Sequence, residues 1–510
     1  MLKWIAHSVS SYSVTRKGTR VPSFLRLRTP VSPWLVLVVV CFAQFMVVLD
    51  ATIVNVALPS IQRDLDLSNQ NLQWVVNAYT LVFGGFLLLG GRAADLLGRR
   101  RLFIVGLSIF SLASLVNALA SSGEMLIVAR GFQGLGGALV SPAALSIITT
   151  TFKEGPDRTK ALSVWGGIAA GGAAFGLLLG GVLTETLSWQ WNFIVNVPVG
   201  AAVLVAALRL VPESRQEGAL RHFDVAGATT VTGGLMLAVY TIVKAQTWGW
   251  GSSTTLAFAA VSIAVLASFV AIELRSPQPL VRLSFFRTRS IATANAAMFL
   301  VAGGMFGMFY FASLYVQEIL GYGPLRAGLA FLPVSAGIMV GAVLSQQLIA
   351  RIGVKTVVVT GMTLAATGLI VLASTTNIDG TYLALLGGLA PMAVGMGMTF
   401  VPLTLVATAG VSAADAGLAS GTFNTSQQVG GALGLAVLAT LASNRTSSSL
   451  GDVAGVPNVL AQHQALVDGF QVAFIASAVL MAVGLATVSA LLRRRDVVEV
   501  DAGDAIAVPA

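Results

Sequence analysis

The feature that most constrains this chain is a series of long apolar runs that recurs along almost its whole length. About fourteen runs approach the roughly 20 apolar residues that a helix needs to cross a bilayer. Only 10% of the residues are charged, against about 25% in soluble domains. The sequence therefore predicts an all-α polytopic membrane protein. The predicted spans are residues 34–58, 72–90, 102–121, 125–149, 162–183, 193–211, 225–243, 256–272, 292–316, 327–349, 357–374, 382–405, 421–441 and 470–492.

The basic residues are distributed unevenly between the two sides of these spans. If the N-terminus is cytoplasmic, all but five of the 30 Lys and Arg residues fall on the cytoplasmic side. Positive charge collects on that side of membrane proteins. We therefore expect a multi-pass protein of the plasma membrane (a bacterial inner membrane) with both termini cytoplasmic. The exceptions are Arg63, Lys244, Arg326 and Arg445 outside, and Arg130 within a span.

Several kinds of site are disfavoured by composition. The single cysteine, Cys41, and three scattered histidines offer neither a disulfide framework nor a metal cluster. The net charge of +9 is explained by the cytoplasmic loops, so no nucleic-acid partner is expected. We expect no cofactor and no resident metal, and no catalytic constellation that would make the protein an enzyme.

Two similar turns indicate a faint internal repeat that would divide the chain into two halves, with chance similarity as the alternative. The turn AADLLG at 93–98 and the turn LIARIG at 348–353 both lead into basic residues between two spans. Repeated halves are a recurrent plan of transporters, with the substrate site between them. We expect a basic tail (1–32), a six-span bundle (33–211), a linker with two extra spans (212–289), a second six-span bundle (290–492) and a cytoplasmic tail (493–510).

Two ionisable residues, Asp50 and Arg130, lie well inside predicted spans. A charge at the bilayer centre costs about 2.5–3.5 kcal/mol on insertion scales, so such residues are functional candidates. Counted at about 1.5 Å per residue from the outer ends of their spans, they lie within about one helical turn of the same depth. We expect them to pair and to couple transport to protons, with Asp50 as the carrier. A purely structural ion pair is the alternative.

Small and polar residues mark two further helix faces. Gln133 follows Arg130 on the same face, so it is a candidate substrate contact. The glycines at 172, 176 and 180, with Gly181, have the four-residue spacing that allows close helix packing.

Six motifs, in order along the chain, resemble the fourteen-span drug:proton antiporters of the major facilitator superfamily. They are LDATIVNVALP (49–59), GRAADLLGRR (91–100), RGFQGLGG (130–137), WQWNF with NVP (189–193, 196–198), GYGPLRAG (321–328) and GTFNTSQQ (421–428). The likeness runs from residue 34 to about 492. One departure is Leu177, which stands where the family's fifth-span motif has proline.

The resemblance implies a major facilitator fold of about fourteen helices, as two six-helix bundles plus two inserted helices. It also implies proton-coupled efflux of amphipathic drugs or antibiotics by alternating access. In such a protein Arg130 is linked to proton transfer. A conformational latch would lie in the 91–100 loop, formed by Gly91, Asp95, Gly98, Arg99 and Arg100.

Candidate substrate contacts in the second half are Phe306 and Tyr310, which share one helix face, and Asn424 and Gln428, which share another. Core packing is an equally weighted alternative for these four. Because one acid implies one proton per cycle, we expect neutral or monocationic amphipathic substrates. Protons and membrane lipid are the other expected partners.

Two other functions stay open. A dedicated exporter or uptake facilitator for one metabolite could use the same fold, because fold does not fix function. A membrane-embedded enzyme is disfavoured by the missing catalytic constellation.

Overall fold

The computed structural model describes residues 32–152, 155–214, 224–277, 279–281, 283–409, 411, 416–451 and 458–493. These residues form helices and loops, with no strand among them. Nearly all of the basic N-terminal tail (1–31) and of the C-terminal tail (494–510) lies outside the described residues.

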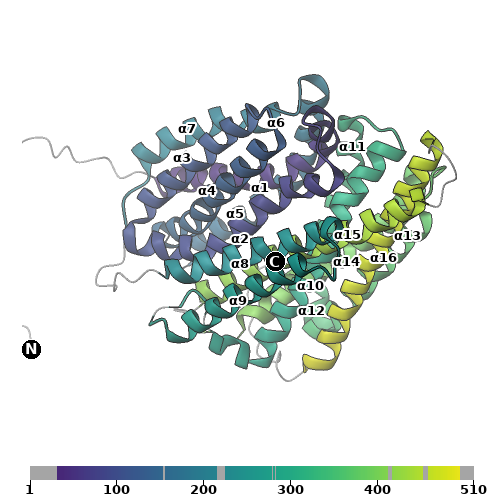
Figure 1. Cartoon of the computed structure of the whole chain (residues 1–510). Coiled ribbons are helices and arrows are strands. Elements are labelled where there is room, and N and C mark those ends of the chain that lie inside the picture. The colour runs from purple at the N-terminus through teal and green to yellow at the C-terminus, as the bar shows by residue number, and fades with distance from the viewer. Residues whose placement is uncertain are drawn as a thin grey trace, which may run out of the picture.

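The first half of the chain forms one helical bundle, drawn in purple and blue in Figure 1. Its helices pack mainly as the pairs α2–α4, α3–α4 and α1–α5. They are α1 (Pro33–Asp64), α2 (Asn69–Leu97), α3 (Arg99–Ala118), α4 (Gly123–Thr151), α5 (Pro156–Thr186), α6 (Trp191–Ile194) and α7 (Asn196–Leu210).

A helical hairpin and a second bundle follow. In the second bundle, α13 packs on α14, α10 packs on α15 and α16, and α12 packs on α14. The hairpin is α8 (Val225–Trp248) and α9 (Ser253–Arg275). The bundle is α10 (Arg289–Leu314), α11 (Pro324–Ala330), α12 (Leu332–Ile352), α13 (Val354–Thr375), α14 (Tyr382–Thr408), α15 (Ala416–Gly451) and α16 (Val459–Leu491), with short η1 (Leu283–Arg287) and η2 (Tyr315–Ile319).

Local sequence signals explain where many of these helices begin. Side-chain oxygens that accept a backbone N–H of the first turn satisfy donors that the helix leaves unpaired. Such N-caps are Ser68, Ser122, Asp224, Ser252, Thr381 and Asn458. The two turns of the internal repeat also share a glycine with a positive φ angle. Gly98 (φ 113°) and Gly353 (φ 79°) each end one helix and start the next in a conformation that favours glycine.

Individual helices account for most of the fourteen predicted spans. Twelve described helical segments, counting α6–α7, α10–η2 and α11–α12 as single segments, are long and apolar enough to cross a membrane. The helices α5 and α15 extend over 31 and 36 residues, at positions where the sequence predicts the other two spans. The all-α polytopic class is confirmed, and the count of fourteen stays a prediction that depends on α5 and α15.

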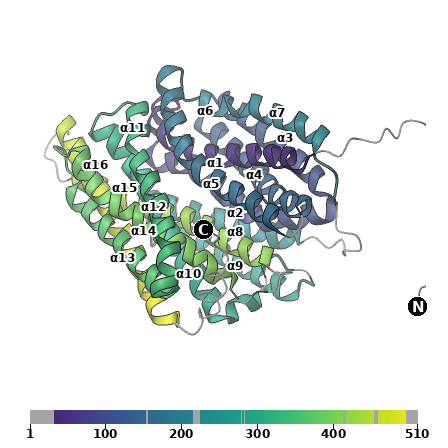
Figure 2. The same ribbon diagram turned by 180° about the vertical axis from the view of Figure 1, so that it is seen from behind.

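The two bundles touch along two seams, which can be followed in Figures 1 and 2. At one seam α2 packs on α15, and the hairpin helix α8 packs on both. Leu81 of α2, Val239 of α8 and Ala432 of α15 belong to one apolar cluster there. At the other seam α5 packs on α11. The hairpin therefore covers the first seam.

Candidate functional site

The two ionisable residues singled out in the first half are in direct contact. Asp50 of α1 and Arg130 of α4 are 0% and 1% exposed. The guanidinium Nη1 of Arg130 donates to Asp50 Oδ2 at 2.5 Å. Their predicted similar depth therefore corresponds to a buried ion pair.

Two amides complete the surroundings of the carboxylate. Gln133 Nε2 donates to Asp50 Oδ1 at 2.7 Å, and Asn196 Nδ2 of α7 donates to the same oxygen at 3.0 Å. Gln133 is 0% exposed. The structure thus places Gln133 in the polar cluster around Asp50, and its role as a substrate contact stays a prediction.

Arg130 is held on several sides. Its Nε donates to the carbonyl of Val75 at 2.9 Å, and its Nη1 also donates to Gln133 Oε1 at 2.7 Å. Its guanidinium carbon lies 4.4 Å from the ring centre of Tyr79, a cation–π distance. These contacts fix the guanidinium beside the acid.

Three residues of this cluster lie beyond the sequence-predicted site. Asn117 Nδ2 donates to Gln133 Oε1 at 2.8 Å, and Gln133 Nε2 donates to Ser114 Oγ at 2.7 Å. With Asn196, all three are at most 1% exposed. The sequence did not single them out, because a neutral polar residue in an apolar run stands out much less than a charged one.

The glycines of α5 lie directly against the helix that carries Asp50. A Cβ on Gly176 would lie 2.1 Å from Thr52 Oγ1 and 2.9 Å from the Leu49 carbonyl. A Cβ on Gly180 would lie 2.7 Å from the Ile53 carbonyl, and one on Gly172 would lie 3.2 Å from Val48. Three of the four glycines therefore pack α5 onto α1 on either side of position 50.

Gly181, the fourth glycine, faces the other bundle. A Cβ there would lie 2.6 Å from the Pro324 carbonyl, and a Cβ on Gly328 would lie 2.4 Å from the Leu177 carbonyl. Glu185 Oε2 accepts the N–H of Leu325 at 2.8 Å. The two bundles therefore approach backbone to backbone at this end, which the distribution of charge predicts to be external.

The four substrate-contact candidates of the second half do not form one cluster. Asn424 is exposed, and Gln428 packs its Cβ against Gly84 of α2 at the seam between the bundles. Phe306 is half-buried against α15 at Gly431. Tyr310 is 3% exposed, with its ring edge-on to Phe311. Their substrate roles stay predictions.

The predicted latch residues contact other parts of the first half. Arg99 Nε donates to Ser146 Oγ of α4 at 2.6 Å, and a guanidinium N–H of Arg100 donates to the Leu208 carbonyl. Gly91 lies against Pro142 of α4. The side chain of Asp95 lies outside the described residues.

An acid that the prediction did not include completes this latch region. Glu213 Oε1 accepts the backbone N–H of Arg100 at 3.2 Å, and Glu213 would also contact a Cβ on Gly98. Since Gly98 offers α3 no capping side chain, Glu213 supplies the negative charge that the start of this helix favours.

A second acid was missed because the predicted eighth span ended at residue 272. Glu273 of α9 is 4% exposed, and its Oε2 accepts the N–H of Val281 at 3.1 Å. In the described part of the chain, neither its Oε1 nor Asp224 Oδ2 has a hydrogen-bond partner. The carboxylate ties the loop before α10 to the hairpin.

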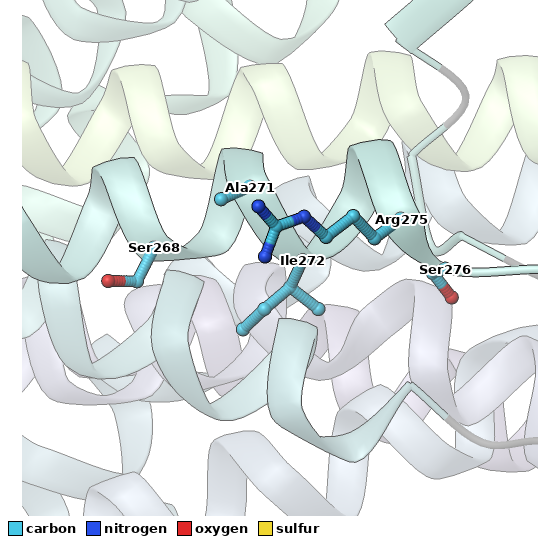
Figure 3. Close-up of a pocket in the computed structure, with 5 residues that line it drawn as sticks. All are labelled: Ser268, Ala271, Ile272, Arg275 and Ser276. Carbon is cyan, nitrogen blue, oxygen red and sulfur yellow. The ribbon is translucent and has the colours of Figure 1, made fainter.

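Two hollows on the surface of the described residues contain no predicted site residue. One lies along the end of α9 between Ser268 and Ser276, where the guanidinium of Arg275 extends back toward Ala271 (Figure 3). The other lies on α3 and α4 around Phe132. Within the described residues, no group of three metal-ligating side chains is present.

Comparison with known proteins shows the family of this chain. The family model of the Major Facilitator Superfamily matches residues 40–435. The chain belongs to the major facilitator superfamily. It is therefore a multi-pass membrane transporter and not an enzyme.

Curated relatives cover most of the chain. It is 40% identical over 466 residues to the puromycin resistance protein pur8 of Streptomyces alboniger, which is 90% of each chain. It is also 40% identical over 423 residues to the cephamycin export protein CmcT of Amycolatopsis lactamdurans, which is 82% of this chain and 87% of the relative.

Among solved structures, the fold is similar to that of a bacterial homologue of the human lysosomal transporter Spinster, in an inward-facing and unoccupied conformation. The TM-score is 0.62 at 17% identity, over 91% of this chain and 97% of that chain. At this identity the likeness concerns the fold alone, and it agrees with the two-bundle architecture.

Proposed function

We propose that this transporter exports amphipathic drugs or antibiotics from the cell in exchange for protons. The observation that carries the proposal is the Asp50–Arg130 pair, which is sealed from solvent inside the first bundle. Relatives named for puromycin resistance and cephamycin export support the drug as cargo.

Asp50 is the proton carrier of the exchange. A buried carboxylate is tolerated when a positive partner and hydrogen-bond donors compensate its charge, and it binds a proton when they withdraw. Arg130, Gln133 and Asn196 provide that compensation here. Any movement that separates α1 from α4 or α7 therefore changes the proton affinity of the site.

The conformation described corresponds to a state closed at the predicted external end. Glu185 and Gly181 of α5 contact the start of α11, and Ser313 Oγ donates to the Asn55 carbonyl of α1 at 2.9 Å. Alternating access then requires these contacts to separate while the predicted cytoplasmic ends approach each other. The latch loop with Arg99 and Arg100 acts at those cytoplasmic ends.

One proton per cycle sets the charge of the cargo. A monocation that leaves in exchange for one proton moves no net charge. Exchange of a neutral drug for one proton moves one net charge, so the membrane potential also drives it, by about 2.3 kcal/mol per 100 mV. We infer neutral or monocationic cargo, with Phe306, Tyr310, Asn424 and Gln428 as candidate contacts. We also infer residence in the bacterial inner membrane, with both termini cytoplasmic.

Transport into inside-out membrane vesicles tests this function. A proton gradient that is acid inside should drive uptake of puromycin, and an uncoupler should abolish it. Asp50→Asn should remove the gradient-driven uptake while protein levels in the membrane stay normal. Glu124→Gln is the matched control, because Glu124 is an exposed acid of the same bundle. Puromycin uptake that is unchanged by the uncoupler would contradict proton coupling.

A further inference from the structure

All described side-chain contacts to the Asp50 carboxylate are donors. Arg130 donates to Oδ2, while Gln133 and Asn196 donate to Oδ1. An ionised carboxylate only accepts hydrogen bonds, whereas a protonated one carries an O–H that must also donate. The arrangement therefore fits the ionised acid and leaves the protonated acid without an acceptor.

Of the three side chains that contact the carboxylate, only the amides of Gln133 and Asn196 contain an acceptor oxygen. The Gln133 oxygen is occupied, because it accepts from Arg130 at 2.7 Å and from Asn117 at 2.8 Å. A buried donor without a partner costs about 1–3 kcal/mol. Protonation of Asp50 therefore favours a rearrangement of one amide.

Reversal of the Gln133 amide provides the missing acceptor. The terminal torsion of glutamine is broad and roughly two-fold, so the amide can turn over without moving the backbone. Its oxygen then faces Asp50 and Ser114, whose hydroxyl can donate as well as accept. Its NH₂ group then faces Arg130 and Asn117.

Asn117 is prepared for that reversed arrangement. Its Oδ1 is buried and has no hydrogen-bond partner among the described residues, although its Nδ2 is bonded to Gln133. If the Asn117 amide also turns over, Oδ1 accepts from the reversed Gln133. This waiting acceptor favours reversal at Gln133 over reversal at Asn196.

Reversal of the amide leaves Arg130 facing another hydrogen-bond donor. After reversal, the NH₂ group of Gln133 opposes the Nη1 donor of Arg130, and the neutral acid no longer attracts the guanidinium. Among the described residues, the charged or titratable groups that face Asp50 are Arg130 on α4 and Tyr79 on α2. The polar contacts from α7 to Asp50 and from α3 to Gln133 come from neutral side chains, so Arg130 is the charge that responds.

We propose that Gln133 and Asn117 form an amide switch, in which both amides reverse when Asp50 gains a proton and thereby release Arg130 from the acid. The two residues are positioning residues that act through Asp50. The inference rests on the proposed function, since it takes Asp50 as the proton carrier.

The pH profile of exchange tests the switch. Asn117→Leu removes the waiting acceptor, so proton loading should need more acid and the midpoint of the profile should fall by about one pH unit, a tenfold change in proton concentration. Asn192→Leu is the control, because Asn192 is equally buried but donates to Thr184 instead. A merely structural role would lower the rate at every pH and leave the midpoint unchanged, which would overturn the switch.

Infrared difference spectra of the wild-type protein provide a test without an altered Asn117. With isotope-labelled glutamine, acidification should change a glutamine amide band together with the carboxyl band of Asp50, and both changes should vanish in Asp50→Asn. A carboxyl band that titrates with unchanged glutamine bands would overturn the switch. If Asp50→Asn instead keeps proton-coupled exchange, the proposed function itself fails.

Discussion

Arg130 donates to Asp50 at 2.5 Å across 80 positions of sequence, and both side chains are excluded from solvent. A buried ion pair contributes little net stability, but removal of one partner leaves an uncompensated charge. The pair is therefore better explained by exchange of a proton than by stability. The amides and glycines around it keep the acid dry and α1 close to α5.

The stability of single and double variants tests that explanation. Arg130→Met should destabilise the protein by about 3–5 kcal/mol, because Asp50 loses the partner that compensates its buried charge and must either stay charged without it or take up a proton. The double variant Asp50→Asn with Arg130→Met should recover most of this loss. Thermal unfolding in detergent measures both effects. A double variant that is as unstable as the two single losses combined would contradict a compensating pair.

The glycine contacts predict a steep difference between two Gly→Ala substitutions. Gly176→Ala places a methyl group 2.9 Å from the Leu49 carbonyl, and overpacking of this kind costs about 1–3 kcal/mol. Gly233→Ala in α8 meets nothing within 4 Å, so it should be neutral or slightly stabilising. The thermal unfolding midpoints of the two variants measure this difference. Equal midpoints would contradict the tight contact between α5 and α1.

Glu185 should bias the conformational equilibrium. Glu185→Ala removes the acceptor for the Leu325 N–H, and one hydrogen bond is worth about 0.5–1.5 kcal/mol. The open population at the predicted external end should therefore rise two- to tenfold. Spin labels at the exposed positions Leu187 and Leu329 can report the separation of α5 and α11. Glu318→Ala, at another exposed acid, should leave the distance distribution unchanged.

Glu273 should anchor the loop that connects the hairpin to the second bundle. Glu273→Ala leaves the Val281 N–H without its acceptor, so that loop should become more sensitive to limited proteolysis. Glu273→Gln keeps an acceptor oxygen and should protect the loop as the wild type does. Equal proteolysis of the two variants would show that the carboxylate does not hold the loop.

Charge in an apolar run made the centre of the site predictable. Asp50 and Arg130 are outliers in their spans, and the constant rise of a helix gives their depth. Ser114, Asn117 and Asn196 could not be selected in this way, because their importance depends on which helix faces Asp50. Glu273 was not selected for a different reason: α9 continues to Arg275, beyond the predicted end of its span at residue 272.

The fold was predictable to a similar degree. Apolar length predicted the polytopic helical class, and the matched glycine turns at Gly98 and Gly353 underlie the faint repeat. The seams between the bundles could not be read from one sequence, because Gly181 and Pro324 meet only through the packing of α5 on α11. The substrate contacts also depend on such packing.

The most direct test of the account is proton movement driven by drug alone in proteoliposomes. A puromycin gradient across the membrane should drive protons in the opposite direction through the wild-type protein, and Asp50→Asn should move none while Glu124→Gln behaves as the wild type does. Proton movement that persists at the wild-type rate in Asp50→Asn would contradict the central claim that this carboxylate carries the proton.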